Sequence, residues 1–284
     1  MNESVKIWID IAKSDLKASK ILYENKNFRT SYFFFQQSSE KSNKAFAFLL
    51  EDFSEKEAKK ILHDQLKPFK KRLIKQSEDF SVLKNLLKSI PVFPFPNGIS
   101  ESNLSGYEES ILGTIHFIDS LKNIDLVRLS SNELNNFLYE IEKNLLLKIK
   151  PKKKPETQIK NLLEKISEWM GEFHTDEAQK AKEEILVFIN DELKLKELVE
   201  IMTAQFIPML FELNFIFFTF FYCAIVTIQH SSRARYPENG VSPDDIYKKN
   251  LPIVKKQIEF MDYLELALKK LEKINLTCSF CLFA

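Results

Sequence analysis

Glycine is scarce in this chain of 284 residues, which contains only 5. Ordinary usage of about 7% would give roughly four times as many. Tight turns are therefore rare, so β-sandwiches, β-propellers and nucleotide folds built on glycine loops do not fit this composition. Cysteine is also scarce, with only Cys223, Cys278 and Cys281, which is too few for a disulfide scaffold. The chain begins with amphipathic sequence rather than a secretory leader, and we expect a cytoplasmic protein.

A strong charge imbalance is absent as well, because 41 Lys and Arg residues face 40 Asp and Glu residues. No overall field attracts nucleic acid or an anionic membrane, so any such contact must be local. The sequence has no Walker loop, dinucleotide fingerprint, catalytic triad order or HExxH motif, and we expect no cofactor and no metal. The single Cys278-x-x-Cys281 pair supports zinc only weakly.

The sequence does show a clear helical periodicity. Apolar residues recur every three or four positions in segments 4–24, 28–53 and 250–273, and prolines interrupt the chain at 91–96, 151–155, 208 and 237. Capping boxes indicate helix starts at Ser54, Ser105 and Ser130, and Asp64 is positioned to cap a helix with Pro68 in its first turn. The sequence therefore predicts an all-α fold.

The middle of the second predicted helix carries a polar stripe formed by Gln37, Glu40, Lys41 and Lys44, at spacings of three and four residues. The residues on both sides of this stripe are apolar. Such a stripe either forms structural ion pairs or lines a solvent-filled groove, because an unpaired buried charge is costly. Both interpretations remain open at the level of sequence.

Four sequence blocks occur in an order that resembles a known family. They are Asp15-Leu16-x-Ala18, Gln36-Gln37-x-x-Glu40-Lys41-x-x-Lys44-Ala45, His63-Asp64-x-Leu66 and Arg235-Tyr236-Pro237. This order resembles the HEPN domain, and the His63 block resembles its abortive-infection relatives of the AbiV type. The resemblance implies an antiparallel helical bundle from residues 1–77 and 209–284, with residues 78–208 as a large inserted helical subdomain.

Nuclease members of this family carry an Arg followed four to six residues later by His, and that order is absent here. The nearest arrangement is His230-x-x-Arg233-x-Arg235, with His63 as a further candidate. His230 and Arg233 fall on one face near a helix end, where the macrodipole favours cations and predicts a protonated imidazole. An Arg and His pair of this kind suits a phosphate or a scissile oxygen, whereas the alternative is that these cations only cap the helix.

Further basic and apolar segments extend the candidate site. Lys67 and Lys71 belong to a basic run after His63 that either contacts RNA or forms a solvated face. Residues 213–228 carry no formal charge, but they are shorter than the about 20 apolar residues that span a membrane. We therefore expect a core or dimer-interface helix there rather than a membrane anchor.

The resemblance implies a prokaryotic defence or toxin–antitoxin protein that acts on RNA or nucleotides, with a metal-independent ribonuclease activity left open. His230, Arg233, Arg235 and His63 are the candidate catalytic residues. Tyr236, Gln37, Glu40, Lys41, Lys44, Lys67 and Lys71 are the candidate RNA- or nucleotide-binding residues. We expect a homodimer, with a nucleotidyltransferase antitoxin as one possible protein partner. The alternatives are a non-catalytic dimeric scaffold that binds a protein, and a membrane-associated effector.

Overall fold

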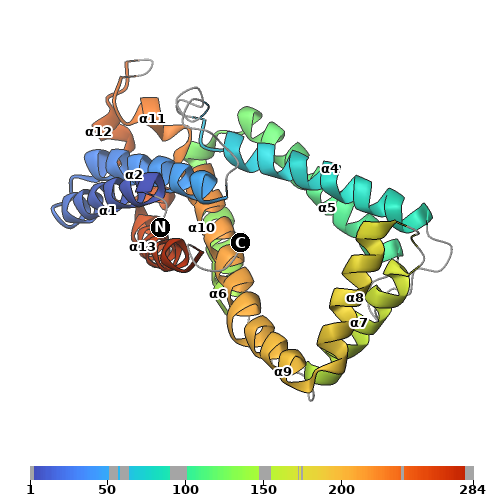
Figure 1. Ribbon diagram of the computed structural model, residues 1–284. Helices are drawn as coiled ribbons and strands as arrows, with labels where there is room; N and C mark the ends of the chain where they lie inside the picture. The colour runs from blue at the N-terminus through green and yellow to red at the C-terminus, as the bar shows by residue number, and fades with distance from the viewer. Residues whose placement is uncertain are drawn as a thin grey trace. The chain divides into compact units, whose positions relative to one another are not determined.

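The computed structural model describes residues 3–50, 57, 64–89, 101–146, 155–171, 173, 175–237 and 240–278. Each regular element within these residues is a helix (Figure 1), so the all-α prediction is confirmed. The longer helices are α1 (Glu3–Glu24), α2 (Phe28–Leu49), α4 (Lys67–Ser89), α5 (Glu101–Ser120), α6 (Ser131–Leu146), α7 (Pro155–Met170), α8 (Asp176–Asn190), α9 (Glu192–Ile201), α10 (Ile207–Thr227) and α13 (Pro252–Cys278). The short ones are η1 (Leu121–Asn123), η2 (Leu126–Arg128), η3 (Met202–Phe206), α11 (His230–Arg233) and α12 (Pro243–Ile246).

The chain divides into two units. The first consists of Met1–Gln76, Ile111–Leu147 and Glu212–Ala284, and the second of Ser77–Ser110 and Lys148–Phe211. This division differs from the predicted insertion at 78–208, because Ile111–Leu147 belongs to the first unit. The reason is that α6 packs against α13 and buries the apolar face formed by Leu134, Leu138 and Ile141. That face is amphipathic in the sequence, but its partner helix lies more than a hundred residues further along the chain.

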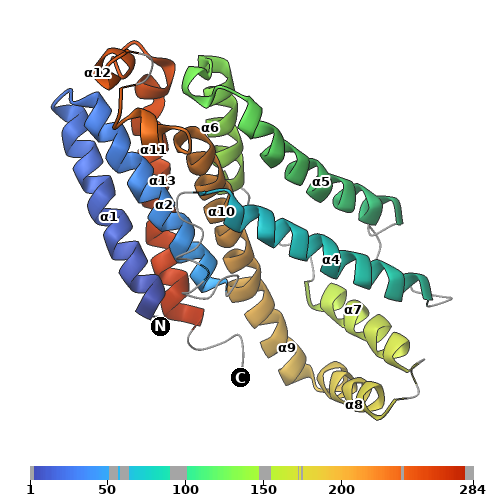
Figure 2. The same cartoon turned by 90° about the horizontal axis from the view of Figure 1, so that it is seen from above.

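Helices α1 and α2 form the most extensive helix pair of the first unit, and α13 lies beside them in both views (Figures 1 and 2). Serines join α1 to α2. Ser19 Oγ donates to the carbonyl oxygen of Ser31 at 2.7 Å, Ser31 Oγ donates to that of Ser19 at 2.8 Å, and Ser38 Oγ donates to that of Ala12 at 2.8 Å. Small hydroxyl side chains allow the two backbones to approach closely while each buried polar group keeps a partner.

Helix α13 joins the C-terminal part of the first unit to its N-terminal part. Lys13 pairs with Glu272 at 2.6 Å, and Lys20 pairs with Asp262 at 2.6 Å and with Glu265 at 2.7 Å. The Tyr23 hydroxyl donates to the carbonyl oxygen of Val254 at 3.1 Å. Polar contacts along the edges of α1 and α13 therefore flank an apolar seam in which Val254, Met261, Leu264 and Leu268 are fully buried.

The C-terminal half of α10 supplies aromatic side chains to the core of the first unit. Phe220 is fully buried and meets Phe46 of α2 edge to face with ring centroids 5.8 Å apart, and Phe221 meets Phe69 in the same manner at 5.4 Å. In the described part of the chain, Glu192–Thr227 is the one helix long and apolar enough to cross a membrane, by length and composition only. Half of its most apolar window is buried inside the protein.

Helix starts agree with the sequence where a side chain caps the backbone directly. The carboxylate of Glu133 accepts from the backbone N–H of Ser130 at 2.8 Å and from its hydroxyl at 2.7 Å, which lowers the pKa of Glu133. Asp64 Oδ1 accepts from the backbone N–H groups of Leu66 and Lys67, both at 3.2 Å. The start at Ser105 is wrong because α5 already begins at Glu101. The predicted start at Ser54 and the interruption by prolines at 91–96 lie outside the described residues.

The interruption predicted at Pro208 coincides with the start of α10 at Ile207, although the helical path continues from α9 without a break. The π-helical turn η3 immediately precedes it and leads from α9 into α10. A π turn has a wider hydrogen-bonding pattern than an α turn, so it accommodates a proline that lacks an N–H. The break that the sequence missed lies at Asp191, whose carboxylate accepts from Leu193 N at 3.0 Å and from Lys194 N at 3.2 Å and so caps α9.

The second unit is built on contacts among α7, α8 and α9. Thr175 caps α8 through its hydroxyl, which accepts from Ala178 N at 3.2 Å. Several large apolar side chains of this unit stay exposed, most of all Leu193 at 81%. The second unit thus retains apolar surface that its own helices do not cover.

Candidate nucleic-acid interface

One end of the first unit brings together the α1–α2 turn, α11 and α12, which we call the bundle end. Both short helices contact α2. Arg29 near the start of α2 pairs through Nε with Asp244 Oδ1 at 2.8 Å, and its Nη1 donates to the carbonyl oxygen of Ala234 at 3.3 Å. Arg29 therefore holds two segments, 230–236 and 243–249, against the N-terminus of α2.

His230 is buried inside the bundle end rather than exposed at a helix terminus. It has no solvent exposure, its ring lies 4.4 Å from that of Tyr32, and its Nδ1 is hydrogen-bonded to the Tyr247 hydroxyl. Burial lowers the pKa of His230 to about 3, with a further contribution from Arg233 and an opposing one from Asp125. The prediction of a protonated His230 is wrong, because desolvation outweighs the effect of the macrodipole.

Two tyrosines complete a neutral cluster around this imidazole. The Tyr32 hydroxyl donates to the carbonyl oxygen of Val226 at 2.7 Å, and burial raises the pKa of both Tyr32 and Tyr247. Among the described residues no group hydrogen-bonds the buried Nε2 of His230. The cluster joins α2, α11 and the end of α12 through uncharged groups, so its evident effect is to fix the position of α12.

Arg233 is paired as well, through its Nη1 to Asp125 Oδ1 at 2.9 Å. Its neighbour Gln229 donates to the carbonyl oxygen of Ile124 at 2.6 Å and accepts from Leu126 N at 3.0 Å. Both side chains hold the segment between η1 and η2 against α10 and α11. Arg233 therefore has a structural partner in place of the phosphate that the sequence suggested.

Arg235 and Tyr236 are exposed at the bundle end. The guanidinium of Arg235 lies 5.4 Å from the ring centre of Phe33 and 5.6 Å from that of Tyr236. Tyr236 is 62% exposed. These two side chains and Phe33 form a cationic and aromatic surface, which we call the Arg235 corner.

The polar stripe of α2 forms ion pairs. Lys41 pairs with Asp15 Oδ2 of α1 at 2.7 Å and donates to Gln37 Oε1 at 3.0 Å, and Lys44 pairs with Glu40 Oε1 at 2.9 Å. The side chains of both pairs are at most 18% exposed. Of the two interpretations of the stripe, the geometry favours structural ion pairs over a solvent-filled groove.

Among the described residues, the candidate residues after the second helix make no contact with the Arg235 corner. His63 lies outside the described residues. Lys71 pairs with Glu57 at 3.0 Å. Lys67 lines a pocket of about 580 Å³ that also contains the Lys70–Asp119 pair, in which Lys70 Nζ lies 2.6 Å from Asp119 Oδ1.

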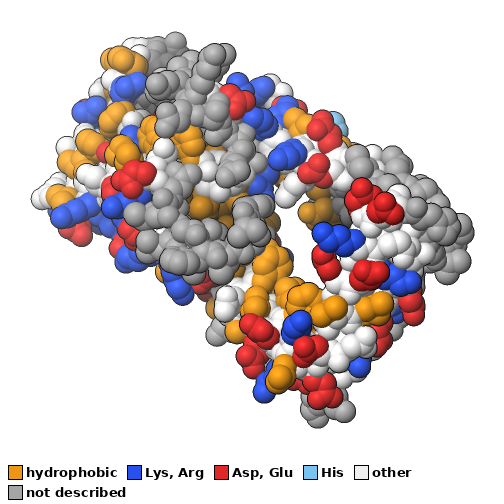
Figure 3. All heavy atoms as spheres, in the orientation of Figure 1, with side chains coloured by type: hydrophobic (Ala, Val, Ile, Leu, Met, Phe, Trp, Pro, Cys, Tyr) orange, Lys and Arg blue, Asp and Glu red, His pale blue; other side chains and the backbone are white. Residues whose placement is uncertain are grey.

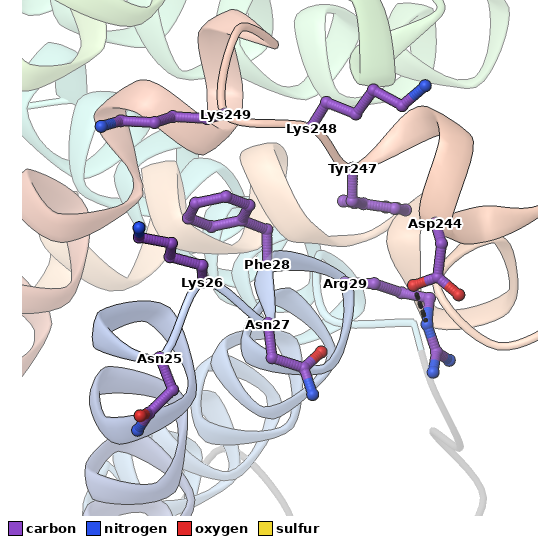
Figure 4. A pocket seen from close by; sticks show the side chains of 9 residues that line it. All are labelled: Asn25, Lys26, Asn27, Phe28, Arg29, Asp244, Tyr247, Lys248 and Lys249. Atoms are coloured by element: carbon purple, nitrogen blue, oxygen red, sulfur yellow. Dashed lines mark hydrogen bonds and ion pairs between the residues drawn. The ribbon is translucent and has the colours of Figure 1, made fainter.

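A second pocket of about 480 Å³ at the bundle end was not found by sequence reasoning (Figure 4). Its lining includes four cationic side chains, which are Lys26, Arg29, Lys248 and Lys249. Phe28 lies between the two segments that supply them. More than two hundred positions separate the first pair of these cations, Lys26 and Arg29, from the second pair, Lys248 and Lys249, so no local pattern indicates the pocket.

On the face drawn in Figure 3, basic and acidic side chains of the described residues are intermixed. Within the described ranges no cluster of three or more His, Cys, Asp or Glu side chains is arranged to hold a metal ion.

Comparison with known families finds one match. Residues 5–90 are similar to the HEPN domain. The HEPN match includes Asp15, Gln37, Glu40, Lys41 and Lys44, and it ends before the Arg235-Tyr236-Pro237 block. No curated protein and no solved structure matches the chain significantly. HEPN domains are helical bundles, in agreement with the first unit, and at the level of the family their function is related to RNA and to defence or toxin systems.

Proposed function

We propose that this protein is a prokaryotic defence or toxin–antitoxin component of the HEPN type, similar to the abortive-infection members of the AbiV type, and that it binds RNA at the bundle end. The Arg235 corner is the observation that supports this proposal. An exposed guanidinium beside two aromatic rings offers both charge for phosphates and flat faces for unstacked bases. The chain carries almost no net charge, so binding must come from such a local surface.

Binding, rather than cleavage by His230, is the activity that the geometry supports. A general acid or base must reach the proton that it transfers and needs a pKa near the working pH. His230 has no solvent exposure, and its pKa is lowered to about 3. Arg233 is engaged with Asp125. The ribonuclease activity left open by the sequence therefore has no support from these two residues.

The test is fluorescence anisotropy of a labelled single-stranded RNA at several salt concentrations. We expect Arg235→Ala to weaken binding about fivefold to tenfold, since one charge and one stacking surface are lost. Arg128→Ala is the matched control, because Arg128 is also an exposed arginine, with a side chain 86% exposed. Equal affinity of Arg235→Ala and wild type would contradict the proposal.

Cleavage is tested separately by incubating the same RNA with the protein in the presence of a metal chelator. We expect intact RNA. Cleavage that disappears in His230→Gln, in a variant with an unchanged melting temperature, would show that His230 becomes exposed and acts on the substrate.

A scaffold that binds a protein partner is the second candidate function, and the surface of the second unit favours it. Val187, Phe188 and Leu193 are 49%, 40% and 81% exposed. Large apolar side chains exposed within one short stretch of chain are typical of a partner surface. A stable partner of the wild type that is lost with Phe188→Glu or Leu193→Glu, but retained by Arg235→Ala, would support this function. Light scattering of the purified protein tests the predicted homodimer.

A further inference from the structure

We infer that the pocket at the α1–α2 turn binds a terminal phosphate group, and that in the RNA-binding function proposed above it receives the phosphate at the 5′ end of the strand. This inference rests on that proposed function for the source of the phosphate, but the chemistry of the pocket is independent of it. Terminal phosphates occur on RNA ends and on free nucleotides, and both share the same doubly charged group.

Charge is the first argument. Four cations line the pocket and one acidic residue, Asp244, accompanies them. Asp244 pairs with Arg29 at 2.8 Å, and Lys248 pairs with Asp245 nearby at 3.2 Å. Lys26 and Lys249 have no ion pair with any residue in the described part of the chain, and both are exposed. Two unpaired ammonium groups match the charge of about −1.5 to −2 on a phosphomonoester better than the single charge of an internal phosphodiester.

Helix ends also lie close to the pocket. Helix α2 begins at Phe28 inside the lining, and α13 begins at Pro252, three residues after Lys249. Neither helix has an acidic residue in its first turn. The positive end of α2 therefore lies at the pocket without a carboxylate in its first turn, and it is opposed by the negative end of α1, which ends at Glu24 beside the lining residue Asn25.

The shape of the pocket is the third argument. Figure 4 shows Lys26 and Lys249 extending toward the same side, from the α1–α2 turn and from the segment before α13, with the ring of Phe28 between the two segments. A volume of about 480 Å³ exceeds what a phosphate alone needs and leaves room for an attached sugar and base. Asn25 and Asn27 also line it, but Asn25 Nδ2 already donates to the carbonyl oxygen of Ile21 and Asn27 Oδ1 already accepts from Thr30 N as the cap of α2.

The pocket is joined directly to the Arg235 corner. Arg29 lines the pocket and donates to the carbonyl oxygen of Ala234, the residue before Arg235. A strand that crosses the Arg235 corner therefore reaches the pocket within a short distance, which favours a strand end over a remote ligand.

Lys26 provides a variant that separates binding from folding. Its φ is 60°, in the left-handed region. This backbone conformation is strained for a residue with a Cβ atom, but it is not strained for glycine. Lys26→Gly should keep or raise the melting temperature while removing one ammonium group from the pocket. We combine it with Lys249→Ala to remove both unpaired cations.

The experiment compares two RNAs of identical sequence, one with a 5′-phosphate and one with a 5′-hydroxyl, each labelled at the 3′ end. We expect wild type to prefer the 5′-phosphate by about fivefold. The Lys26→Gly/Lys249→Ala variant should lose this preference and keep its affinity for the 5′-hydroxyl RNA. Lys17→Ala/Lys75→Ala removes the same charge from exposed lysines elsewhere and should keep the preference.

Three outcomes distinguish the two proposals. If both RNAs bind equally to wild type and to the pocket variant, the pocket inference is overturned and the RNA-binding function stands. If neither RNA binds, the proposed function fails, and adenosine monophosphate against adenosine then tests the pocket alone. If wild type binds the monophosphate and the pocket variant does not, a free nucleotide is supported as the source of the terminal phosphate. If wild type does not bind the monophosphate, the inference is overturned.

Discussion

The burial of His230 predicts how the stability of the first unit depends on pH. The pKa of this histidine is lowered from 6.5 to about 3 in the folded protein. In the unfolded chain the His230 imidazole therefore binds a proton near pH 6.5, whereas in the folded protein it stays neutral at this pH. The free energy of unfolding consequently decreases as the pH falls below this value. The expected loss approaches about 1.4 kcal/mol per pH unit from this residue alone, or roughly 2 kcal/mol in total between about pH 6.5 and about pH 4.5.

The assay is urea unfolding at a series of pH values, followed through the fluorescence of Trp8. Trp8 stacks on Phe48 with ring centres 6.5 Å apart and so reports on the α1–α2 pair. Trp169 of the second unit is replaced by Phe to remove its signal. His230→Gln cannot titrate, so the difference in slope between it and wild type isolates the histidine from the carboxylates.

The exposed His116 provides the control, since His116→Gln should keep the slope of the wild type. Equal slopes for wild type and His230→Gln would refute the reasoning, because they would mean that His230 is solvated or protonated in the folded protein. A steeper slope in the variant would refute it equally.

Three further predictions test the packing of the first unit. A double-mutant cycle on Asp15 and Lys41 should give a coupling free energy of about 1 kcal/mol, more than an exposed pair, because the two side chains are only 18% exposed; a value near zero would show that the pair is solvated. Tyr32→Phe should lower the free energy of unfolding by about 1 kcal/mol in urea titrations, since the carbonyl oxygen of Val226 loses its buried donor. Cys223 is fully buried and burial raises the pKa of its thiol, so a thiol reagent should label it only at the rate of unfolding, whereas fast labelling under native conditions would show an open core.

The sequence predicts those features of the structure that depend on residues close together in the chain. The capping boxes at Ser130 and the cap at Asp64 depend on a side chain and a backbone group within three positions, and both form. The alternation of apolar residues in α2 likewise predicts its buried face, in which Phe35 and Phe46 are buried. The helix start predicted at Ser105 is wrong, because the same capping pattern also occurs inside a helix that has already begun.

The bundle end shows why the rest was not predictable. His230 is buried by Tyr32 from α2 and by Tyr247 from the loop after α12, and neither lies within one helical turn of it. The local sequence, with a histidine and arginines near a helix end, predicts that the histidine is protonated. Tertiary packing decides the protonation state instead, because two aromatic rings remove the solvent that a charged imidazole needs.

The same distinction separates the lysines that stabilise the fold from those that are available to a ligand. Lys41 and Lys44 match the family pattern, but each has a carboxylate within 2.9 Å, from Asp15 of α1 in one case and from Glu40 in the other. Alanine at either position would remove the cation beside that carboxylate in a poorly solvated place, so a loss of RNA binding in such a variant would report on folding first. Lys26 and Lys249 match no motif and have no carboxylate partner among the residues that the structure describes, so their removal leaves no charge stranded. Substitution of a lysine that has no structural partner tests binding without disturbing the fold. At the bundle end, such lysines can be identified only from the tertiary structure.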